Sequence, residues 1–336
     1  MNSQRPTMRM VAAEAGVSTA IVSQVLNGRT DTASPATRER VFAAAKALGY
    51  RINRTARAMR TGRTGLALLS LTMLPDPWSQ EAAQALTRRL AAEGVQALVL
   101  PDGNWREVLR QHDFDVAFID AAEDAHQETL TQLVKEGNRL VVMGGKALQA
   151  DGFDVVRSPG LDGCRAAMRH LVQMGHRRIH CLGGRVDGVY TPRVEAWREV
   201  LTEHGLPCGE QMLHPFGYDR NEAMAAALAA LGRGQDGPTA LFCTTDFAAI
   251  AAVQAARFLN LRVPDDISII GAGNTAEGRG LKPALSSVGP ENFMDRVADI
   301  LMDRLYDRRE PLVHTFGWEL FVRESSAAPA TRGPAR

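Results

Sequence analysis

The residues that most clearly could do chemistry are basic, and they gather at the N-terminal end of the chain. Residues 1–64 contain eleven Lys and Arg against three Asp and Glu, which gives a formal charge of +8, while the rest of the chain carries −7. The arginines are concentrated between Arg51 and Arg63. A small basic head on a larger acidic body predicts that the head binds a polyanion. A solubilising charged surface is the alternative interpretation.

Three short helices are predicted to form this head and to position its side chains. Apolar spacing predicts helices over residues 8–15, 19–26 and 34–48, and Gly16 ends the first of them. Two short helices joined by a tight glycine turn are typical of a helix-turn-helix DNA-binding unit. A generic three-helix bundle would account for the apolar spacing, but it would not account for the charge.

The second helix of such a unit enters the major groove of DNA, where its first residues contact base edges. The side chains that it presents here are Thr19, Ala20, Ser23 and Gln24. Gln24 can bind adenine through two hydrogen bonds, while Thr19 and Ala20 can contact thymine methyl groups. The alternative for Gln24 is a solvated helix residue.

Beyond residue 65 the pattern changes to apolar runs that alternate with amphipathic segments. Strands are predicted over 65–71, 97–100, 116–119, 140–143, 178–182, 240–243 and 267–271. Helices are predicted over 80–93, 128–136, 160–174, 191–204, 220–231, 247–259 and 293–308. This alternation is typical of doubly wound α/β sheets, and the length of the segment favours two of them.

Several functional classes find little support in the sequence. Cys164, Cys181, Cys208 and Cys243 lack metal-ligand spacing and are predicted to be free thiols, so no metal and no cofactor is expected. No apolar run is long enough to span a membrane, and the first residues lack the apolar core of a secretory signal. Glycines between Gly271 and Gly280 resemble a dinucleotide motif, but they lie in the wrong structural context. We therefore expect a cytoplasmic protein that is not an enzyme.

The head closely resembles the LacI/GalR family of bacterial repressors. The matching residues are 11–12, 14–18, 22–23, 25–28, 37–41, 48–50, 53–54, 56–57 and 60–64. The body is similar to further family landmarks at 171–179, 240–246, 263–268, 283–285 and 320–326. The resemblance covers residues 7–326, and it implies a helix-turn-helix head, a hinge helix and a two-lobed body like that of periplasmic sugar-binding proteins.

The resemblance also implies which residues contact the operator. These are Thr7, Ser18, Thr19, Ala20, Ser23, Gln24, Asn27, Asn53, Arg54, Arg57, Met59 and Arg60. Residues 53–60 match the hinge helix, in which Met59 takes the place of a leucine that wedges into the minor groove. A flexible linker rich in Gly and Arg is the alternative for this segment. The family usually has Arg where this chain has Gln24, which predicts a different operator half-site.

The resemblance places an effector site between the two lobes of the body. The residues implied to bind the effector are Trp78, Trp197, Arg193, Asp246 and Asn274. An arginine fork and a carboxylate together suit the vicinal hydroxyls of a sugar. The alternatives are a surface salt bridge for Arg193, a helix N-cap for Asp246 and a core or interface position for Trp78. The family's acidic pair after strand 267–271 is replaced by Gly273-Asn274, and Ser158-Pro159 stands where Asp-Asn is usual.

The sequence therefore predicts four parts. Residues 1–50 form the DNA-binding domain, 51–64 the hinge, 65–326 the effector-binding and dimerisation domain, and 327–336 a disordered tail. Lobe 1 comprises about 65–158 and 291–317, and lobe 2 about 159–290 and 318–326. The expected function is regulation of transcription, with a palindromic double-stranded DNA operator, a small carbohydrate effector and a second copy of the chain as partners. A solute-binding protein without a transcriptional role is the alternative.

Overall fold

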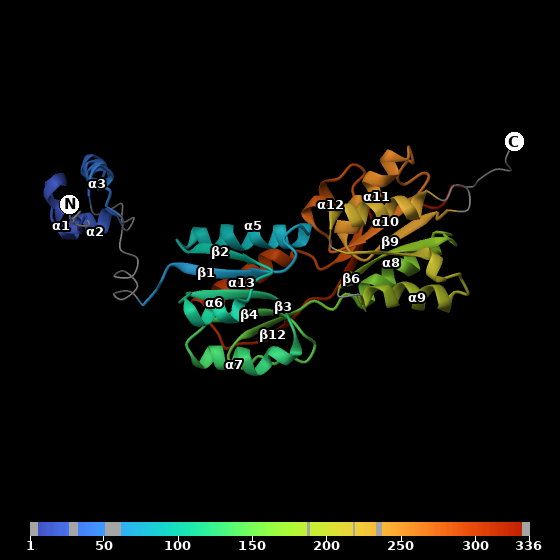
Figure 1. Cartoon of the computed structure of the whole chain (residues 1–336), viewed down its shortest axis with the longest axis horizontal. Helices are drawn as coiled ribbons and strands as arrows, with labels where there is room; N and C mark the ends of the chain where they lie inside the picture. The colour runs from blue at the N-terminus through green and yellow to red at the C-terminus, as the bar shows by residue number, and fades with distance from the viewer. Residues whose placement is uncertain are drawn as a thin grey trace. The chain divides into compact units, whose positions relative to one another are not determined.

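The computed structural model describes residues 6–26, 33–50, 62–186, 189–217, 219–232 and 237–330. The chain divides into two compact units, which we call the head (Met1–Thr64) and the body (Gly65–Arg336). Each unit has its own hydrophobic core, and Figure 1 shows their helices and strands.

The head contains three helices around a small apolar core. These are α1 (Met8–Ala15), α2 (Thr19–Leu26) and α3 (Pro35–Ala47). Gly16 ends α1 in the left-handed region at φ 65°, which a glycine adopts without steric cost, and the chain turns there into α2. Ser34 caps α3, because its hydroxyl accepts the Thr37 amide at 3.2 Å. The predicted helix-turn-helix is confirmed.

Lobe 1 of the body is a parallel sheet covered by helices on both faces. Its strand order is β12-β5-β4-β3-β1-β2. The strands are β1 (Leu66–Leu71), β2 (Gln96–Pro101), β3 (Val116–Ala122), β4 (Leu140–Gly144), β5 (Asp154–Arg157) and β12 (Val313–Thr315). One face packs against α5 (Pro77–Ala92) and α13 (Phe293–Leu305). The other packs against α6 (Trp105–Gln111) and α7 (Gln127–Lys135), which follows the short helix η1 (Asp124–His126).

Lobe 2 repeats this layered arrangement. Its strand order is β13-β11-β10-β9-β6-β7, and β8 also pairs with β6. The strands are β6 (Ile179–Val186), β7 (Val189–Tyr190), β8 (Leu213–Phe216), β9 (Ala240–Cys243), β10 (Ser268–Ala272), β11 (Ser286–Gly289) and β13 (Glu319–Phe321). The helices are α8 (Leu161–Gln173) and α9 (Arg193–Glu203) on one face, and α10 (Arg220–Leu231) and α11 (Asp246–Phe258) on the other. The short helices η2 (Glu210–Met212) and α12 (Ala276–Gly280) complete the lobe.

The chain passes between the lobes at residues 158–160, 290–292 and 316–318. The first two crossings follow the carboxyl ends of β5 and β11, so the ligand-binding ends of both sheets border the same space. The predicted two-lobed α/β body is confirmed. The sequence interpretation missed several short elements, because runs of two to four residues such as β7 and β11 carry too little periodicity to be recognised.

A buried charge cluster joins three elements of lobe 1. Asp154 at the start of β5 is fully buried, and it accepts hydrogen bonds from Arg304 Nε at 2.9 Å and Arg309 Nη1 at 2.8 Å. His314 Nε2 lies 2.9 Å away, and the Leu312 amide donates at 3.1 Å. Burial alone would raise the pKa of Asp154, but these hydrogen bonds outweigh it and hold that pKa well below its usual range.

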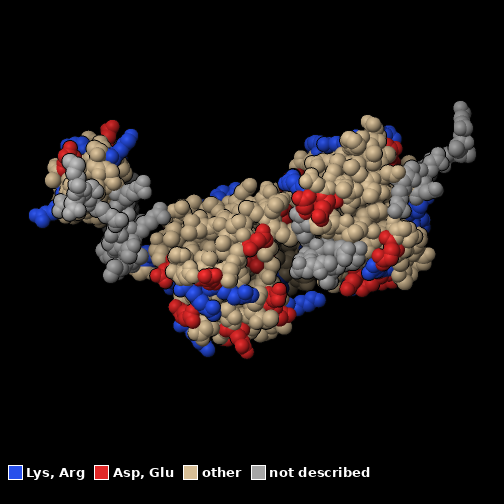
Figure 2. All heavy atoms as spheres, viewed as in Figure 1, with Lys and Arg blue, Asp and Glu red and all other residues tan. Residues whose placement is uncertain are grey.

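The remaining observations concern the surface and the cysteines. No helix among the described residues has the length and apolar character that crossing a membrane requires. Figure 2 shows Lys, Arg, Asp and Glu interspersed over the visible face of the body. Cys164, Cys181 and Cys243 are buried free thiols, and Cys208 is a partly exposed one.

Candidate functional site

The predicted DNA-contacting residues of the head lie just before α2 and along it. Ser18, Thr19 and Ala20 are exposed, while Ser23 and Gln24 are half-buried. The Ser18 hydroxyl also accepts the Ile21 amide at 3.3 Å, so this residue stabilises the first turn of the helix it precedes.

Other predicted DNA contacts fall at the edge of what the structure describes. Thr7 is exposed and caps α1, because its hydroxyl accepts the Met10 amide at 3.4 Å. The remaining predicted contacts lie outside the described residues; they are Asn27, Asn53, Arg54, Arg57, Met59 and Arg60.

Two adjoining cavities lie between the lobes of the body. The first, called here the aspartate pocket, has a volume of about 190 Å³. Its lining residues are Thr72, Met73, Asp76, Trp78, Ser79, Asp120, Met143, Ser158, Arg193, Thr245, Ala272, Gly273, Pro290 and Trp318. The second, called the arginine pocket, measures about 420 Å³ and includes Arg88, Arg279 and Arg323 in its wall. Trp78, Gly273 and Pro290 border both.

Arg193 lies on the lobe 2 wall of the aspartate pocket. It is the first residue of α9, and its Nη1 donates to the carbonyl oxygen of Thr244 at 2.7 Å. Its guanidinium lies 4.6 Å from the centre of the Trp318 ring. The Trp318 indole donates in turn to the Ser158 hydroxyl at 2.7 Å. Arg193 is therefore oriented by lobe 2 and by the last crossing segment, instead of lying in a surface salt bridge.

Two carboxyl groups lie on the lobe 1 wall of the aspartate pocket. Asp76 caps α5, and its Oδ1 accepts the Trp78 amide at 2.8 Å. Asp120 lies in β3, and its Oδ2 accepts the Thr72 hydroxyl at 2.7 Å and the Thr72 amide at 3.4 Å. Burial is the main cause that raises the pKa of Asp76 to about 6, and the nearby charges of Asp246 and Asp120 act in the same direction. Burial also raises the pKa of Asp120. This wall therefore carries acceptors whose ionised form is poorly stabilised without a ligand.

Asp246 was predicted to bind the effector directly, but the structure places it beneath the cleft. It is 1% exposed, belongs to α11 and does not border either pocket. It accepts hydrogen bonds from the Thr275 amide and hydroxyl at 2.7 and 2.8 Å and from the Ser287 hydroxyl at 2.5 Å. A side chain at Gly271 would come within 2.3 Å of its Oδ1. Asp246 therefore holds β10, β11 and α12 together, and its N-cap is Thr245.

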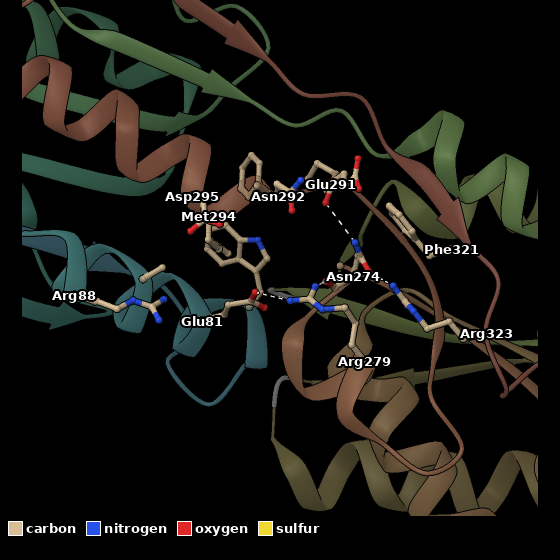
Figure 3. A pocket seen from close by; sticks show the side chains of 15 residues that line it. Glu81, Arg88, Asn274, Arg279, Glu291, Asn292, Met294, Asp295, Phe321 and Arg323 are labelled. Atoms are coloured by element: carbon tan, nitrogen blue, oxygen red, sulfur yellow. Dashed lines mark hydrogen bonds and ion pairs between the residues drawn. The ribbon is translucent and has the colours of Figure 1, made fainter.

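Asn274 borders the arginine pocket (Figure 3). Its Oδ1 accepts from Arg323 Nη2 at 2.6 Å, and its Nδ2 donates to the Pro290 carbonyl oxygen at 3.4 Å. Its backbone is left-handed at φ 51°, a conformation that Asn tolerates better than most residues. Asn274 therefore serves as an anchor between lobe 2 and the middle crossing.

The two predicted tryptophans have different surroundings. Trp78 borders both pockets, and its ring centre lies 6.3 Å from that of Phe293. Trp197 requires a correction, because it is fully buried in the lobe 2 core and its indole donates to the Ile179 carbonyl oxygen at 3.0 Å. It lies on the inner face of α9, so it supports the helix that carries Arg193 and does not line the cleft.

One ion pair joins the lobes at the arginine pocket. Glu81 of α5 accepts from Arg279 Nη2 at 3.0 Å and from the Ala276 amide at 2.6 Å, so a lobe 1 carboxylate binds the first turn of α12 in lobe 2. Figure 3 shows Arg279 pointing toward Glu81 across the pocket. We call this contact the Glu81 latch.

Sequence reasoning missed several residues of the aspartate pocket. These are Thr72, Asp76, Asp120, Ser158 and Trp318. A signal existed for two of them: Asp76-Pro77 has the form of a helix N-cap, and Asp120 directly follows the buried run Val116–Ile119. Trp318 could not be recognised, because it enters the cleft through the third crossing.

Comparisons with known proteins cover both units. Residues 7–53 match the family described as "Bacterial regulatory proteins, lacI family", and residues 168–326 match "Periplasmic binding protein-like domain". The HTH-type transcriptional regulator CelR of Thermobifida fusca is 31% identical over 96% of this chain and 98% of its own length. The HTH-type transcriptional repressor PurR of Erwinia tasmaniensis is 29% identical over 90% of this chain and 92% of its own.

A solved structure gives the same result. It is described as a transcriptional regulator CelR–cellobiose complex, with a TM-score of 0.60, 29% identity, and coverage of 96% of this chain and 100% of that one. These similarities favour a DNA-binding transcriptional regulator over a solute-binding protein, because the latter leaves the match of the head unexplained. The predicted resemblance is confirmed, and the chain belongs to the LacI family of bacterial regulatory proteins.

Proposed function

We propose that this regulator binds a palindromic operator as a homodimer and that a small carbohydrate or carbohydrate derivative in the aspartate pocket controls its affinity for DNA. In this proposal it represses catabolic or transport genes, works at the nucleoid in the cytoplasm and has no enzymatic activity. The observation that carries the proposal is the presence, in one chain, of a LacI-type head and a two-lobed body with a polar interlobe cavity.

The proposed DNA contacts follow from the exposure of α2. Thr19 and Ala20 at its first turn are free to approach thymine methyl groups, and half-buried Gln24 lies about one turn farther along. Phosphate contacts by the basic residues of the head would supply salt-dependent affinity.

The homodimer is supported by apolar side chains exposed on the body. Leu98 and Val99 on the edge strand β2 are each 40% exposed. Large apolar side chains gathered at a sheet edge mark association surfaces. Two heads related by a twofold axis would then match a palindrome.

The carbohydrate effector is supported by the lining of the aspartate pocket. Asp76 and Asp120 can accept hydrogen bonds from vicinal hydroxyls, and Arg193 can donate to hydroxyl oxygens. Trp78 offers an apolar face to a sugar ring. The similar CelR structure is a complex with cellobiose.

The link between ligand and DNA is a change in the arrangement of the lobes. A ligand that contacts Asp76 in lobe 1 and Arg193 in lobe 2 binds one arrangement better than another, so it shifts their equilibrium. The Glu81 latch is a contact that only the closely apposed lobes can make. By linkage, the operator must change effector affinity by the same factor.

Binding to the DNA upstream of the chain's own gene tests the proposal. We expect the full chain to bind a palindrome from that region with two chains per site, measured by analytical ultracentrifugation. It should lose affinity steeply as salt rises, measured by fluorescence anisotropy. The variant Gln24→Ala should lose about 1–3 kcal/mol of discrimination between the palindrome and random DNA. One chain per site, or equal affinity for random DNA at every salt concentration, would contradict the proposal.

A further inference from the structure

We propose that the effector is a compact polyol that carries a positively charged amine, and that Asp76 and Asp120 bind this amine. The inference rests on the proposed function, because it specifies the ligand of the same pocket. It begins with the position of the two carboxyl groups, which both border the aspartate pocket from lobe 1.

Neither carboxyl group has a cationic partner in the described part of the chain. Asp76 accepts the Trp78 amide through Oδ1, and Asp120 accepts the Thr72 hydroxyl and amide through Oδ2. No Lys, Arg or His nitrogen of the described residues lies within 4.0 Å of either of them. Partly buried carboxylates without an ion partner are poorly stabilised, so they favour a ligand that brings the missing positive charge.

The pocket wall supplies one positive charge against these two negative ones. Arg193 is the cation among the described lining residues, and it is engaged with the Thr244 carbonyl oxygen and the Trp318 ring. Asp246 lies buried behind the wall and adds negative potential at Asp76. An anionic ligand such as a sugar phosphate would have to approach this excess of negative charge.

Arg88, Arg279 and Arg323 line the neighbouring arginine pocket and do not border the aspartate pocket. Arg279 pairs with Glu81, and Arg323 donates to Asn274 Oδ1 and to the Leu285 carbonyl oxygen. Their hydrogen-bonding groups are thus committed to the arginine pocket and to the backbone of lobe 2.

The remainder of the lining suits the polyol part of the ligand. Thr72, Ser79, Ser158 and Thr245 bring hydroxyl groups to the wall, and Trp78 brings an aromatic ring that attracts cations as well as sugar faces. The aspartate pocket, at about 190 Å³, is smaller than the adjoining arginine pocket, at about 420 Å³, which favours a compact ligand such as a single ring.

The acid–base properties of the pocket agree with this geometry. Burial and the neighbouring carboxylates raise the pKa of Asp76 to about 6, while Arg193 acts in the opposite direction. Burial and Asp102 raise the pKa of Asp120. A bound ammonium group would favour the ionised carboxylates, so amine binding should strengthen as pH rises through about 6.

Calorimetric titration of the full chain with matched probes tests the inference. The probes are glucosamine and glucose, galactosamine and galactose, glucamine and glucitol, and glucose 6-phosphate. At neutral pH and low salt, we expect at least one amine to bind about tenfold or more tighter than its neutral counterpart. The phosphate should bind more weakly than either. This preference should decline as the pH falls below about 6.

Variants that neutralise one carboxylate test which residues cause the preference for the amine. Asp76→Asn and Asp120→Asn keep the shape of the side chain and should each reduce the amine preference to about threefold or less. Glu128→Gln removes an exposed charge of α7 outside the cleft and serves as the matched control, which should keep the full preference.

The outcomes separate this inference from the proposed function. A neutral sugar that binds as tightly as its amine, and loses binding in Arg193→Ala, would overturn the amine and leave the carbohydrate effector. Tightest binding of the phosphate, or an amine preference unchanged in both Asn variants, would likewise overturn the inference. Failure of every probe to bind would overturn the inference, and operator binding that persists in the same preparation would show that the DNA-binding part of the proposed function stands.

Discussion

Lobe 1 holds two acidic sites at opposite ends of the strands of its parallel sheet. The surroundings of the two sites differ. Asp154 at the start of β5 is enclosed by Arg304, Arg309 and His314, which lower its pKa. Asp76 and Asp120, near the carboxyl ends of β1 and β3, have only neutral donors, and burial raises their pKa values. The first site is completed by the protein, whereas the second is left for a ligand to complete. A carboxylate that stabilises the fold can thus be recognised by the basic side chains that pair with it. A carboxylate that binds a ligand can be recognised by the absence of such side chains.

Removing the Asp154 carboxylate should have the largest effect on the stability of the protein. Asp154→Ala leaves two arginines without their buried carboxylate, and we expect it to lower the free energy of unfolding by about 3–5 kcal/mol. Urea denaturation of the body followed by circular dichroism would measure this. Asp162→Ala, which removes an exposed partner of Arg165, is the matched control and should cost less than about 1 kcal/mol.

The pH dependence sharpens this prediction. Because the folded-state pKa of Asp154 is lowered, its contribution is present above the unfolded-state pKa of about 4 and is lost as the pH falls through the folded-state value. The difference between wild type and Asp154→Ala should therefore shrink in acid. A difference that stayed constant down to the acid transition would mean that packing, and not the ion cluster, carries the effect.

Neutralising Asp76 in the aspartate pocket should stabilise the protein, in contrast to the loss of Asp154. The folded-state pKa of Asp76 is raised to about 6, so its favourable contribution is present at acid pH and is lost as the pH rises through 6. Asp76→Asn keeps the helix cap and should raise the melting temperature of the ligand-free chain by about 2–4 °C near neutral pH, with little change near pH 4. Differential scanning calorimetry at both pH values checks this, and a destabilised variant at neutral pH would refute it.

The smallest expected effect belongs to the Glu81 latch between the lobes. Glu81→Ala removes one partly exposed ion pair and one backbone hydrogen bond, so we expect a loss of about 0.5–1 kcal/mol from the closed arrangement. This should appear as a severalfold weaker binding of the cleft ligand in calorimetry. Glu128→Ala is the control, and equal behaviour of the two variants would show that the latch does not favour closure.

Most of the fold could be predicted from the sequence, whereas much of the site could not. Long apolar periods located helices such as α8 and α11 within one or two residues, and the run 240–243 located β9. The family resemblance also singled out Arg193 and Trp78, and both line the aspartate pocket. Trp197 and Asp246 were misplaced, because resemblance gives the position of a residue along an element but not its burial. Whether a side chain is covered depends on packing between strands distant in the sequence, as the Thr275 and Ser287 contacts of Asp246 illustrate.

Control of operator binding by a ligand in the aspartate pocket can be measured directly. Fluorescence anisotropy would follow the full chain and its Arg193→Ala variant on a labelled palindrome, with and without each ligand that binds in calorimetry. We expect similar DNA affinity for both proteins without ligand. With ligand, the operator Kd of wild type should change by at least about fivefold, and that of the variant should not change. An operator affinity that stayed constant in wild type while the aspartate pocket was saturated with ligand would contradict this expectation.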